Sequence, residues 1–246
     1  MVITSPQNPL IKSLAELKEK KGRKKQNAYL VEGVKMVLEA IKFNMPIKLI
    51  IGLQEIVETL NFSGEKYFAD QKVLSKLSDC ETCQGVFAVI EFNKDNFTIP
   101  KENCVLLDRV RDPGNLGTII RTCVALGIKN IYLLDCVDCY SPKVVRSSMS
   151  GIYSVNLIEV DQEKLLDLAS KIDFLTADMS GENVFEFTPK NNYCLVMGNE
   201  ANGISEQVKN LTKTFVSIPM QSGIESLNVG VAFAVIGYQL FYKKQV

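Results

Sequence analysis

The sequence predicts an α/β protein built from two domains, and three observations support this. Short apolar runs alternate with segments of helical periodicity along the whole chain of 246 residues, as in folds where strands pack against helices. In the second half these runs are apolar at almost every position, which is typical of parallel strands covered on both faces. Between the halves, residues 93–103 are polar, contain a proline and lack periodicity. We therefore predict an N-terminal domain at 1–95, a linker at 96–103 and a C-terminal domain at 104–246.

The first half is predicted to form a small α/β unit with a parallel or mixed sheet. Its first helix is indicated by Leu10, Ile11, Leu14 and Leu17, which fall on one helical face after the turn-forming segment 5–9. Strands are expected at 29–31, 48–51, 67–69 and 86–92, and the other helices at 33–41, 55–60 and 72–77.

The second half repeats the alternation with longer helices, which predicts a mainly parallel sheet. The strands are expected at 104–107, 131–134, 155–158, 174–176, 193–197 and 215–218. The helices are expected at 117–126, 142–149, 163–171, 204–211 and 226–242.

Composition excludes several classes of protein. The sequence has no histidine, which excludes a Ser-His-Asp triad, a His-ligated zinc and an imidazole base. The longest apolar stretch, Val229–Tyr242, falls short of the ~20 residues that a membrane helix needs. The N-terminal residues lack the basic and apolar regions of a signal peptide. We therefore expect a cytoplasmic protein without a membrane segment.

The seven cysteines are expected to be free thiols, because nothing in the sequence indicates secretion. Two C-x-x-C pairs stand out, Cys80 with Cys83 and Cys136 with Cys139. They lie much farther apart than the ~15–20 residues of a zinc ribbon, so we expect no metal. A thioredoxin-like role for the second pair stays open, against the more common role of intracellular cysteine as a small buried hydrophobe.

Charge is unevenly distributed, although the formal net charge is zero. Residues 1–50 hold ten Lys and Arg against four Glu. The densest basic cluster contains Lys18, Lys20, Lys21, Arg23, Lys24 and Lys25. Such a run is either the solvated end of a helix or a patch that contacts the phosphates of a nucleic acid.

Three segments of the second half, 108–121, 197–204 and 218–229, combine Gly, Asn and Pro with a few charges. Each follows a predicted strand and leads towards a predicted helix. In α/β sheets, ligands bind at the carboxyl ends of the strands, so three such turns in one domain predict a single composite site of an enzyme. Neither NAD nor ATP is indicated, because 114–117 lacks the three-glycine spacing and Ile204-Ser205 replaces the P-loop Lys-Ser/Thr.

For each polar residue in these turns, a local structural role such as helix capping is the alternative to a role in an active site. Asn115 is a candidate cap of a helix that starts near Leu116, which would place Arg121 in its second turn. Glu200 is also typical of an acid near a helix entrance, and Ser226 and Asn228 are typical of simple caps.

Taken together and in order, the three segments resemble a known family. Asp112-Pro-Gly-Asn-Leu-Gly-Thr-Ile-Ile-Arg121, Gly198-Asn-Glu-Ala-Asn-Gly-Ile204 and the segment from Ile218-Pro-Met to Ser-Leu-Asn-Val229 are similar to the three ordered motifs of the SpoU (TrmH-type) family of RNA ribose 2′-O-methyltransferases. The resemblance spans about Cys104 to Tyr242. The first half resembles, more loosely, the N-terminal RNA-binding domain of members that modify ribosomal RNA, through Ser5–Pro9 and Leu30-Val-Glu-Gly33.

The resemblance implies a C-terminal α/β knot domain of the SPOUT type, S-adenosyl-L-methionine as cofactor and a homodimer with its active sites near the interface. The matching family positions imply catalytic roles for Asn115, Arg121, Glu200, Ser226 and Asn228. They imply cofactor contacts for Gly198, Ile218 and Leu227. Many relatives have serine where this chain has Gly230, so position 230 supplies no hydroxyl. With the family in view, the basic cluster 18–25 is expected to contact RNA.

The expected reaction is methylation of a ribose 2′-hydroxyl, with ribosomal RNA of the large subunit favoured and tRNA as the alternative. Our hypothesis is that Arg121 binds the adjacent phosphate and stabilises the developing alkoxide, because a guanidinium rarely gives up its proton. Ser226, Asn228 or water would then lie in the proton path. Two rival functions remain at this point: a non-catalytic RNA-binding module of the same fold, and a thiol redox protein that uses Cys136 and Cys139.

Overall fold

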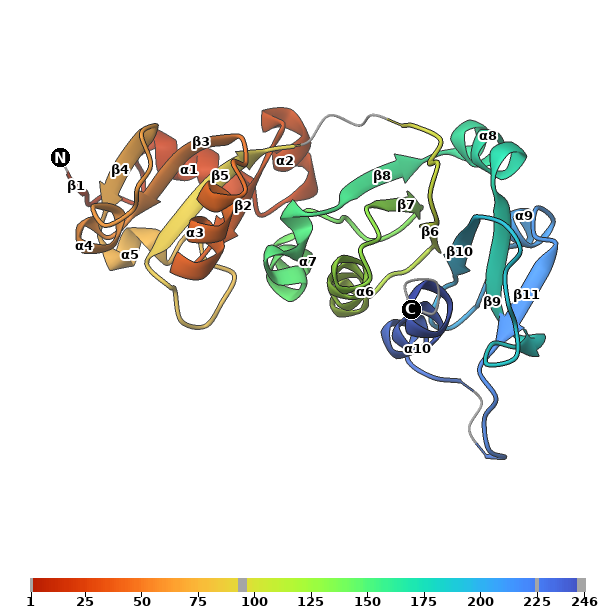
Figure 1. The fold of residues 1–246 in the computed structure, drawn as a ribbon. Helices are drawn as coiled ribbons and strands as arrows, with labels where there is room; N and C mark the ends of the chain where they lie inside the picture. The colour runs from red at the N-terminus through yellow and green to blue at the C-terminus, as the bar shows by residue number, and fades with distance from the viewer. Residues whose placement is uncertain (1, 93–96, 224–225, 243–246) are drawn as a thin grey trace. The chain divides into compact units, whose positions relative to one another are not determined.

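The structure, a computed structural model, describes residues 2–92, 97–223 and 226–242 (Figure 1). The chain folds into two compact units, Met1–Asn93 with Tyr140–Tyr153, and Lys94–Cys139 with Ser154–Val246. The expected linker lies partly outside the described residues. From the sequence, 140–153 was expected in the C-terminal domain, whereas in the structure this stretch belongs with the first unit. One reason is that the Tyr140 ring packs on Tyr29 and Phe92, with centroids 4.7 and 4.6 Å apart.

The first unit is built on a mixed five-stranded sheet with the order β1-β4-β3-β5-β2. Its strands are β1 (Val2–Ile3), β2 (Ala28–Glu32), β3 (Ile47–Gly52), β4 (Glu65–Ala69) and β5 (Val86–Glu91). Its helices are α1 (Pro9–Glu16), α2 (Lys20–Gln26), α3 (Val34–Lys42), α4 (Gln54–Val57), α5 (Gln71–Leu74), α7 (Pro142–Ser148) and the 3-10 helix η1 (Met149–Tyr153). The sheet is mixed because β5 pairs antiparallel with β2 and β3. A mixed sheet was one of the two forms predicted from the sequence.

The second unit contains a six-stranded sheet with the order β11-β9-β10-β6-β7-β8, in which every neighbouring pair is parallel. The strands are β6 (Cys104–Asp108), β7 (Asn130–Leu134), β8 (Asn156–Val160), β9 (Asp173–Asn183), β10 (Tyr193–Met197) and β11 (Thr214–Ser217). The helices are α6 (Pro113–Ala125), α8 (Gln162–Lys171), α9 (Glu206–Lys209) and α10 (Val229–Phe241). The predicted parallel sheet is therefore confirmed.

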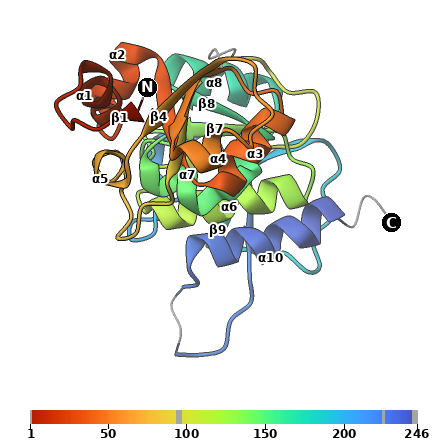
Figure 2. The same cartoon turned by 90° about the vertical axis from the view of Figure 1, so that its left-hand side faces the viewer.

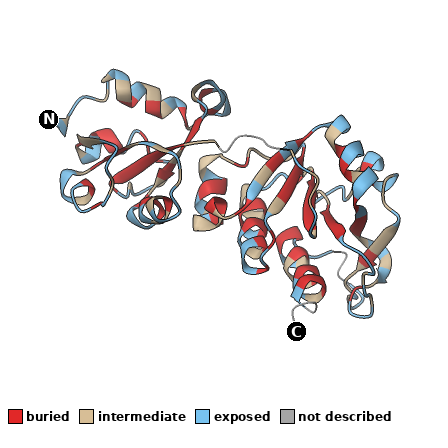
Figure 3. Ribbon diagram, turned by 45° about the horizontal axis from the view of Figure 1, so that its top comes forward, coloured by how far each residue is buried: buried red, intermediate tan, exposed pale blue. Residues whose placement is uncertain are grey.

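Helices cover both faces of the parallel sheet, as the apolar strands require. Side chains of α8 and α9, among them Leu165, Leu168 and Val208, join one hydrophobic core with the strands. On the other face α10 lies alongside α6 (Figures 1 and 2). The central strands β6 and β10 are buried at every position (Figure 3).

Two helix starts differ from the prediction and matter for the site. Helix α6 begins at Pro113, earlier than predicted, and Asp112 caps it by accepting a hydrogen bond of 2.8 Å from the Asn115 backbone N–H. Asn115 is therefore not the cap, and Arg121 is the ninth residue of α6, in its third turn. Helix α10 begins at Val229, and Asn228 caps it. Within the described residues, no helix is long and apolar enough to span a membrane.

Candidate active site

The carboxyl ends of four neighbouring strands meet at one edge of the parallel sheet. Strands β11, β9, β10 and β6 lie side by side in parallel register, so the segments that follow them converge. At this edge lies a cavity of about 360 Å³, within the ~300–1,000 Å³ range of small-molecule sites. Its lining comes from 177–179 after the buried part of β9, from the end of β10 and the loop after it (197–203), from 216–220 around the end of β11, and from 226–229 with Ala232 and Ile236 of α10.

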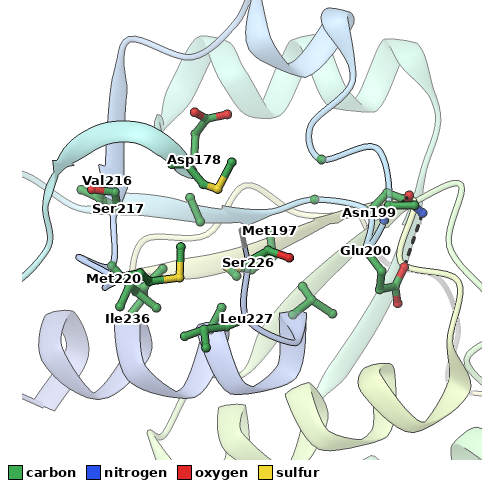
Figure 4. A pocket seen from close by; sticks show the side chains of 18 residues that line it. Asp178, Met197, Asn199, Glu200, Val216, Ser217, Met220, Ser226, Leu227 and Ile236 are labelled. Carbon is green, nitrogen blue, oxygen red and sulfur yellow. Dashed lines mark hydrogen bonds between the residues drawn. The ribbon is translucent and has the colours of Figure 1, made fainter. Parts of the chain in front are cut away.

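Five of the predicted site residues line this cavity: Gly198, Glu200, Ile218, Ser226 and Leu227. In Figure 4, Met220, Leu227 and Ile236 lie along one side, and Asn199 and Glu200 lie at one end. Most of the lining side chains are apolar. The cavity therefore combines an apolar wall with a polar end built from the loop after β10.

The wall at Ala177, Asp178 and Met179 was not predicted from the sequence. The predicted strand stopped at Thr176, and the rule that ligands bind at strand ends was not applied to the residues after it. That rule was the signal that would have found them.

Gly198 allows the two strands of the 197–204 loop to approach closely. A Cβ at this position would lie 2.6 Å from the carbonyl carbon of Gly203, closer than packed atoms tolerate. Asn199 and Gly203 close the loop by two backbone hydrogen bonds of 2.9 and 3.0 Å, and Gly203 has a φ of +62°, which glycine adopts without strain. The sequence Gly-Asn-Glu-Ala-Asn-Gly thus shapes the polar end of the cavity.

A chain of side-chain hydrogen bonds connects the three motif segments. Asn115 Nδ2 donates to Glu200 Oε1 at 2.9 Å, and Asn228 Nδ2 donates to Asn115 Oδ1 at 2.8 Å. Asn228 Oδ1 in turn accepts from the backbone N–H of Gly230 and Val231 at the start of α10. The orientation of both amides is therefore defined by this chain, which we call the Glu200–Asn115–Asn228 relay.

Glu200 lies at the start of α6 and not at the entrance of the helix that follows it in the chain, which was the local alternative to a role in the site. Its carboxylate accepts hydrogen bonds from the backbone N–H of Arg111 at 3.3 Å and of Asp112 at 3.2 Å. Burial alone would raise the pKa of Glu200. The hydrogen bonds from Asn115 and from the backbone lower it, and the net pKa lies below the ordinary value of 4.5. The carboxylate is therefore ionised at neutral pH.

A second carboxylate, that of Asp178, faces the same cavity. Hydrogen bonds from the side chain and the backbone N–H of Ser180, 2.6 and 2.9 Å long, lower the pKa of Asp178 below its ordinary value of 3.8. Two ionised carboxylates beside an apolar wall suit a ligand that carries an apolar ring system together with hydroxyl groups or positive charge.

Arg121 and the relay residues Asn115 and Asn228 are not part of the cavity wall. Arg121 is exposed on α6. Within the described part of the chain, no hydrogen bond or ion pair engages its side chain. The guanidinium is therefore available to a ligand outside the cavity.

The basic cluster is divided by the structure into buried and exposed members. Arg23 is only 3% exposed, and its Nη1 donates to the carbonyls of Leu17 and Lys18 at 2.7 Å each. This corrects the expectation that Arg23 contacts RNA, because its charge holds the turn between α1 and α2. Lys18 donates to the Ser78 carbonyl at 2.8 Å. Four side chains of the cluster remain exposed: Lys20, Lys21, Lys24 and Lys25.

All seven cysteines are free. Burial raises the pKa of Cys136 to about 12 and raises that of Cys139 well above its ordinary value. Reactive cysteines have lowered pKa values, because the thiolate is the nucleophile. The rival function as a thiol redox protein therefore has no support from the second pair.

Comparison with known proteins assigns the chain. Residues 102–238 match the profile of the SpoU rRNA Methylase family. The chain belongs to the SpoU rRNA methylase family. Residues 8–88 match the MRM3-like substrate binding domain. The family assignment and the likeness to solved SpoU structures confirm the predicted α/β knot fold class.

Several SpoU relatives match almost the whole chain. A 23S rRNA guanosine 2′-O-methyltransferase from Bacillus subtilis, RlmP, is 30% identical over 97% of this chain and 98% of the relative. An uncharacterised tRNA/rRNA methyltransferase from Synechocystis is 33% identical over 96% of this chain and 92% of its own length. The solved structure of the SpoU methyltransferase AviRb from Streptomyces viridochromogenes, in complex with the cofactor AdoMet, has a TM-score of 0.89 at 27% identity and covers 97% of this chain and 99% of AviRb.

Proposed function

We propose that this protein transfers a methyl group from S-adenosylmethionine to a ribose 2′-hydroxyl of large-subunit ribosomal RNA. The observation that carries the proposal is the relay that joins all three motif segments beside a cavity of cofactor size. RlmP, which matches nearly the whole chain, and a 23S rRNA uridine 2′-O-methyltransferase from Streptomyces viridochromogenes, which matches 88% of it, support ribosomal RNA as the substrate class.

The cavity fits S-adenosylmethionine by its chemistry. The apolar wall, with Ile218, Leu227 and Met220, suits the adenine ring, and the Asp178 carboxylate at the rim suits ribose hydroxyls. When bound, the cofactor would supply a methyl group attached to a sulfonium, a good leaving group because the sulfur becomes a neutral thioether once the methyl group is transferred. The loop 197–203 would hold it through backbone groups, because Gly198 brings that backbone to the cavity surface.

The residues of the chain orient the RNA and stabilise charge. The exposed Arg121 guanidinium binds the phosphate next to the target ribose and stabilises the negative charge that develops on the 2′-oxygen as its proton leaves. Both polar atoms of the Asn228 side chain are engaged, because Nδ2 donates to Asn115 and Oδ1 accepts from the start of α10. We therefore assign Asn228, Asn115 and Glu200 to positioning, and Ser226 or water to the proton path.

The test uses purified protein, labelled S-adenosylmethionine and two RNA preparations from the source organism, ribosomal RNA and tRNA. We expect label to enter ribosomal RNA isolated without this enzyme, at a 2′-oxygen, as shown by resistance of the adjacent bond to alkaline cleavage. Label in tRNA alone would contradict ribosomal RNA as the substrate and identify tRNA instead. Cofactor binding without label in either RNA would favour the non-catalytic RNA-binding module.

Neutralising the exposed part of the basic cluster is expected to weaken RNA binding. In the variant Lys20→Gln, Lys21→Gln and Lys24→Gln, each lost phosphate contact makes the negative slope of log affinity against log salt shallower by about 0.7–0.9. The measurement is RNA affinity at several salt concentrations, with S-adenosylmethionine affinity as the control. Arg23→Gln should instead lower the melting temperature, because the α1–α2 turn loses its charged hydrogen bonds. An unchanged salt slope in the triple variant would contradict the proposed patch.

The exposed face of α10 supports a homodimer. Val231, Tyr238 and Tyr242 are 50%, 48% and 53% exposed, and their spacing places them on one side of the helix. We propose that two copies pair through this face. The variant Val231→Glu with Tyr238→Glu should sediment as a monomer and lose methyl transfer, whereas Leu166→Glu on α8, 51% exposed, should leave the dimer intact. A monomeric wild-type protein would refute the pairing.

We also propose a cytoplasmic location, because the proposed substrate is ribosomal RNA. Cell fractionation tests this, and recovery of the protein with membranes would contradict it.

A further inference from the structure

The first unit contains a second cavity, of about 200 Å³, that the proposed reaction does not use. Three features of the sequence meet there. These are the segment Leu30-Val-Glu-Gly33, the loop that carries Cys80 and Cys83, and helix α7. We call it the α7 cavity.

The floor of the α7 cavity is apolar. Leu77, Phe87 and Val145 line it and are at most 3% exposed, Met36 completes the floor, and Met149, which is 37% exposed, lines its outer part. An apolar floor of this kind suits an aromatic ring more than a sugar or an ion.

The rim of the α7 cavity carries three cations, Lys18, Lys35 and Arg146, against one exposed carboxylate, that of Asp79. Arg146 Nη1 donates to Cys80 Sγ at 3.2 Å, and the same nitrogen lies 3.8 Å from Asp79 Oδ2. These contacts leave a guanidinium that is nearly half exposed. Positive groups above an apolar floor match a phosphate attached to an aromatic ring.

Glu32 also lines the α7 cavity, and its carboxylate is engaged by the loop 78–84. Its carboxylate accepts hydrogen bonds of 2.9 Å from Ser78 Oγ and from the Gln84 backbone N–H. The loop 78–84 is therefore held in place, and the exposed Gln84 side chain lies at the rim. A side-chain amide offers both a donor and an acceptor to the edge of a base.

The backbone of the floor is strained at Met149. This residue has a φ of +52° and a ψ of −150°, a conformation that is essentially restricted to glycine. Strain of this kind clusters at ligand sites. The strain at Met149 therefore favours a functional role for the α7 cavity, independently of its size and charge.

We infer that the α7 cavity receives one unstacked nucleotide of the RNA substrate, with the base on the apolar floor and a phosphate against Lys35 and Arg146. The inference rests on the proposed function, since it takes the substrate to be RNA. The volume supports a single base, because complete cofactors and drug-sized ligands occupy about 300 Å³ or more. Single-stranded RNA is commonly read in this way, by stacking and by contacts to the base edge.

Methionine positions provide a test that separates this site from the cofactor cavity. Of the seven methionines, Met36 and Met149 line the α7 cavity, and Met179, Met197 and Met220 line the other. The full-length protein with ¹³C-methyl methionine is titrated with cytidine and uridine 5′-monophosphates, which lack the adenine of the cofactor, while methyl NMR signals are recorded. We expect the Met36 and Met149 signals to shift and the signals of Met45 and Met197 to stay.

The variants that test the site remove positive charges inside the cavity, and the control removes one outside it. Lys35→Gln with Arg146→Gln should weaken nucleotide binding at least about tenfold, because two charge-assisted contacts are lost. Gln84→Ala, an exposed change, should reduce the difference between the nucleotides. The control Lys42→Gln lies on the same helix as Lys35 but outside the cavity and should bind like the parent protein.

Two outcomes overturn the inference: Met36 and Met149 signals that ignore both nucleotides, or inorganic phosphate that reproduces their shifts, which would make the site a simple anion site. A separate titration with S-adenosylmethionine reads Met197 and Met220. Failure of that titration would contradict the proposed function and leave the nucleotide readout to be judged by itself.

Discussion

Replacement of Arg121 by lysine is expected to lower the turnover of methyl transfer by at least about 100-fold. The guanidinium is exposed on α6, and within the described residues no hydrogen bond or ion pair occupies it. Its planar pair of donors can hold a phosphate through two bonds, whereas the lysine ammonium is a point charge that cannot reproduce this geometry. Because Arg121 lies outside the cavity wall, the affinity for S-adenosylmethionine should not change.

The measurement is single-turnover methylation of ribosomal RNA, with cofactor affinity and melting temperature as controls. Arg121→Ala should be no more active than Arg121→Lys if the bidentate contact is what matters. A lysine variant with near-normal turnover would contradict the assigned role, since a single positive charge would then suffice. Equal loss of cofactor binding and of melting temperature would show instead that the variant is misfolded.

The parts of the fold that follow from burial were predictable. Strand β10 was predicted with the bounds that the structure shows, and β6 to within one residue, because every side chain in both is buried and apolar but for the last residue of β6, Asp108. Helix α2 was missed, because its sequence, Lys-Lys-Gly-Arg-Lys-Lys-Gln, has no apolar stripe. The helix is held instead by the buried Arg23 guanidinium. Periodicity cannot detect a helix that is fixed by a charged side chain.

The position of the composite site in the fold was predictable, but the hydrogen bonds between its residues were not. Strand ends and turn residues indicated three converging segments. In the structure, residues of 197–204 and 218–229 line one cavity, and 108–121 is joined to both segments by the hydrogen bonds of Asn115. Asn115 was expected to be a cap, whereas Asp112 caps α6 and releases the Asn115 side chain to bond with Glu200 and Asn228. Both residue types cap helices well. The sequence does not show which of the two caps the helix, because the partners of the Asn115 side chain, Glu200 and Asn228, lie far away in the chain.

The largest effect on the cofactor is expected from Gly198→Ala. The added Cβ would lie 2.6 Å from the Gly203 carbonyl carbon and 2.8 Å from its oxygen. These are backbone atoms, and two hydrogen bonds between Asn199 and Gly203 hold them in place, so the loop must move as a whole. We expect the affinity for S-adenosylmethionine to fall at least about tenfold and stability to fall by about 1–3 kcal/mol. Calorimetric titration and thermal unfolding measure the two effects.

The matched control is Gly127→Ala, the same substitution outside the cavity. Gly127 has a φ of +73°, and a Cβ added there would meet no atom within 4 Å, so alanine costs about 1–2 kcal/mol of backbone strain without a clash. That variant should lose stability and keep its cofactor affinity. If Gly198→Ala bound S-adenosylmethionine as tightly as Gly127→Ala does, the close approach of the 198–203 loop would have no part in holding the cofactor. The loop would then serve only to carry Glu200 to the start of α6.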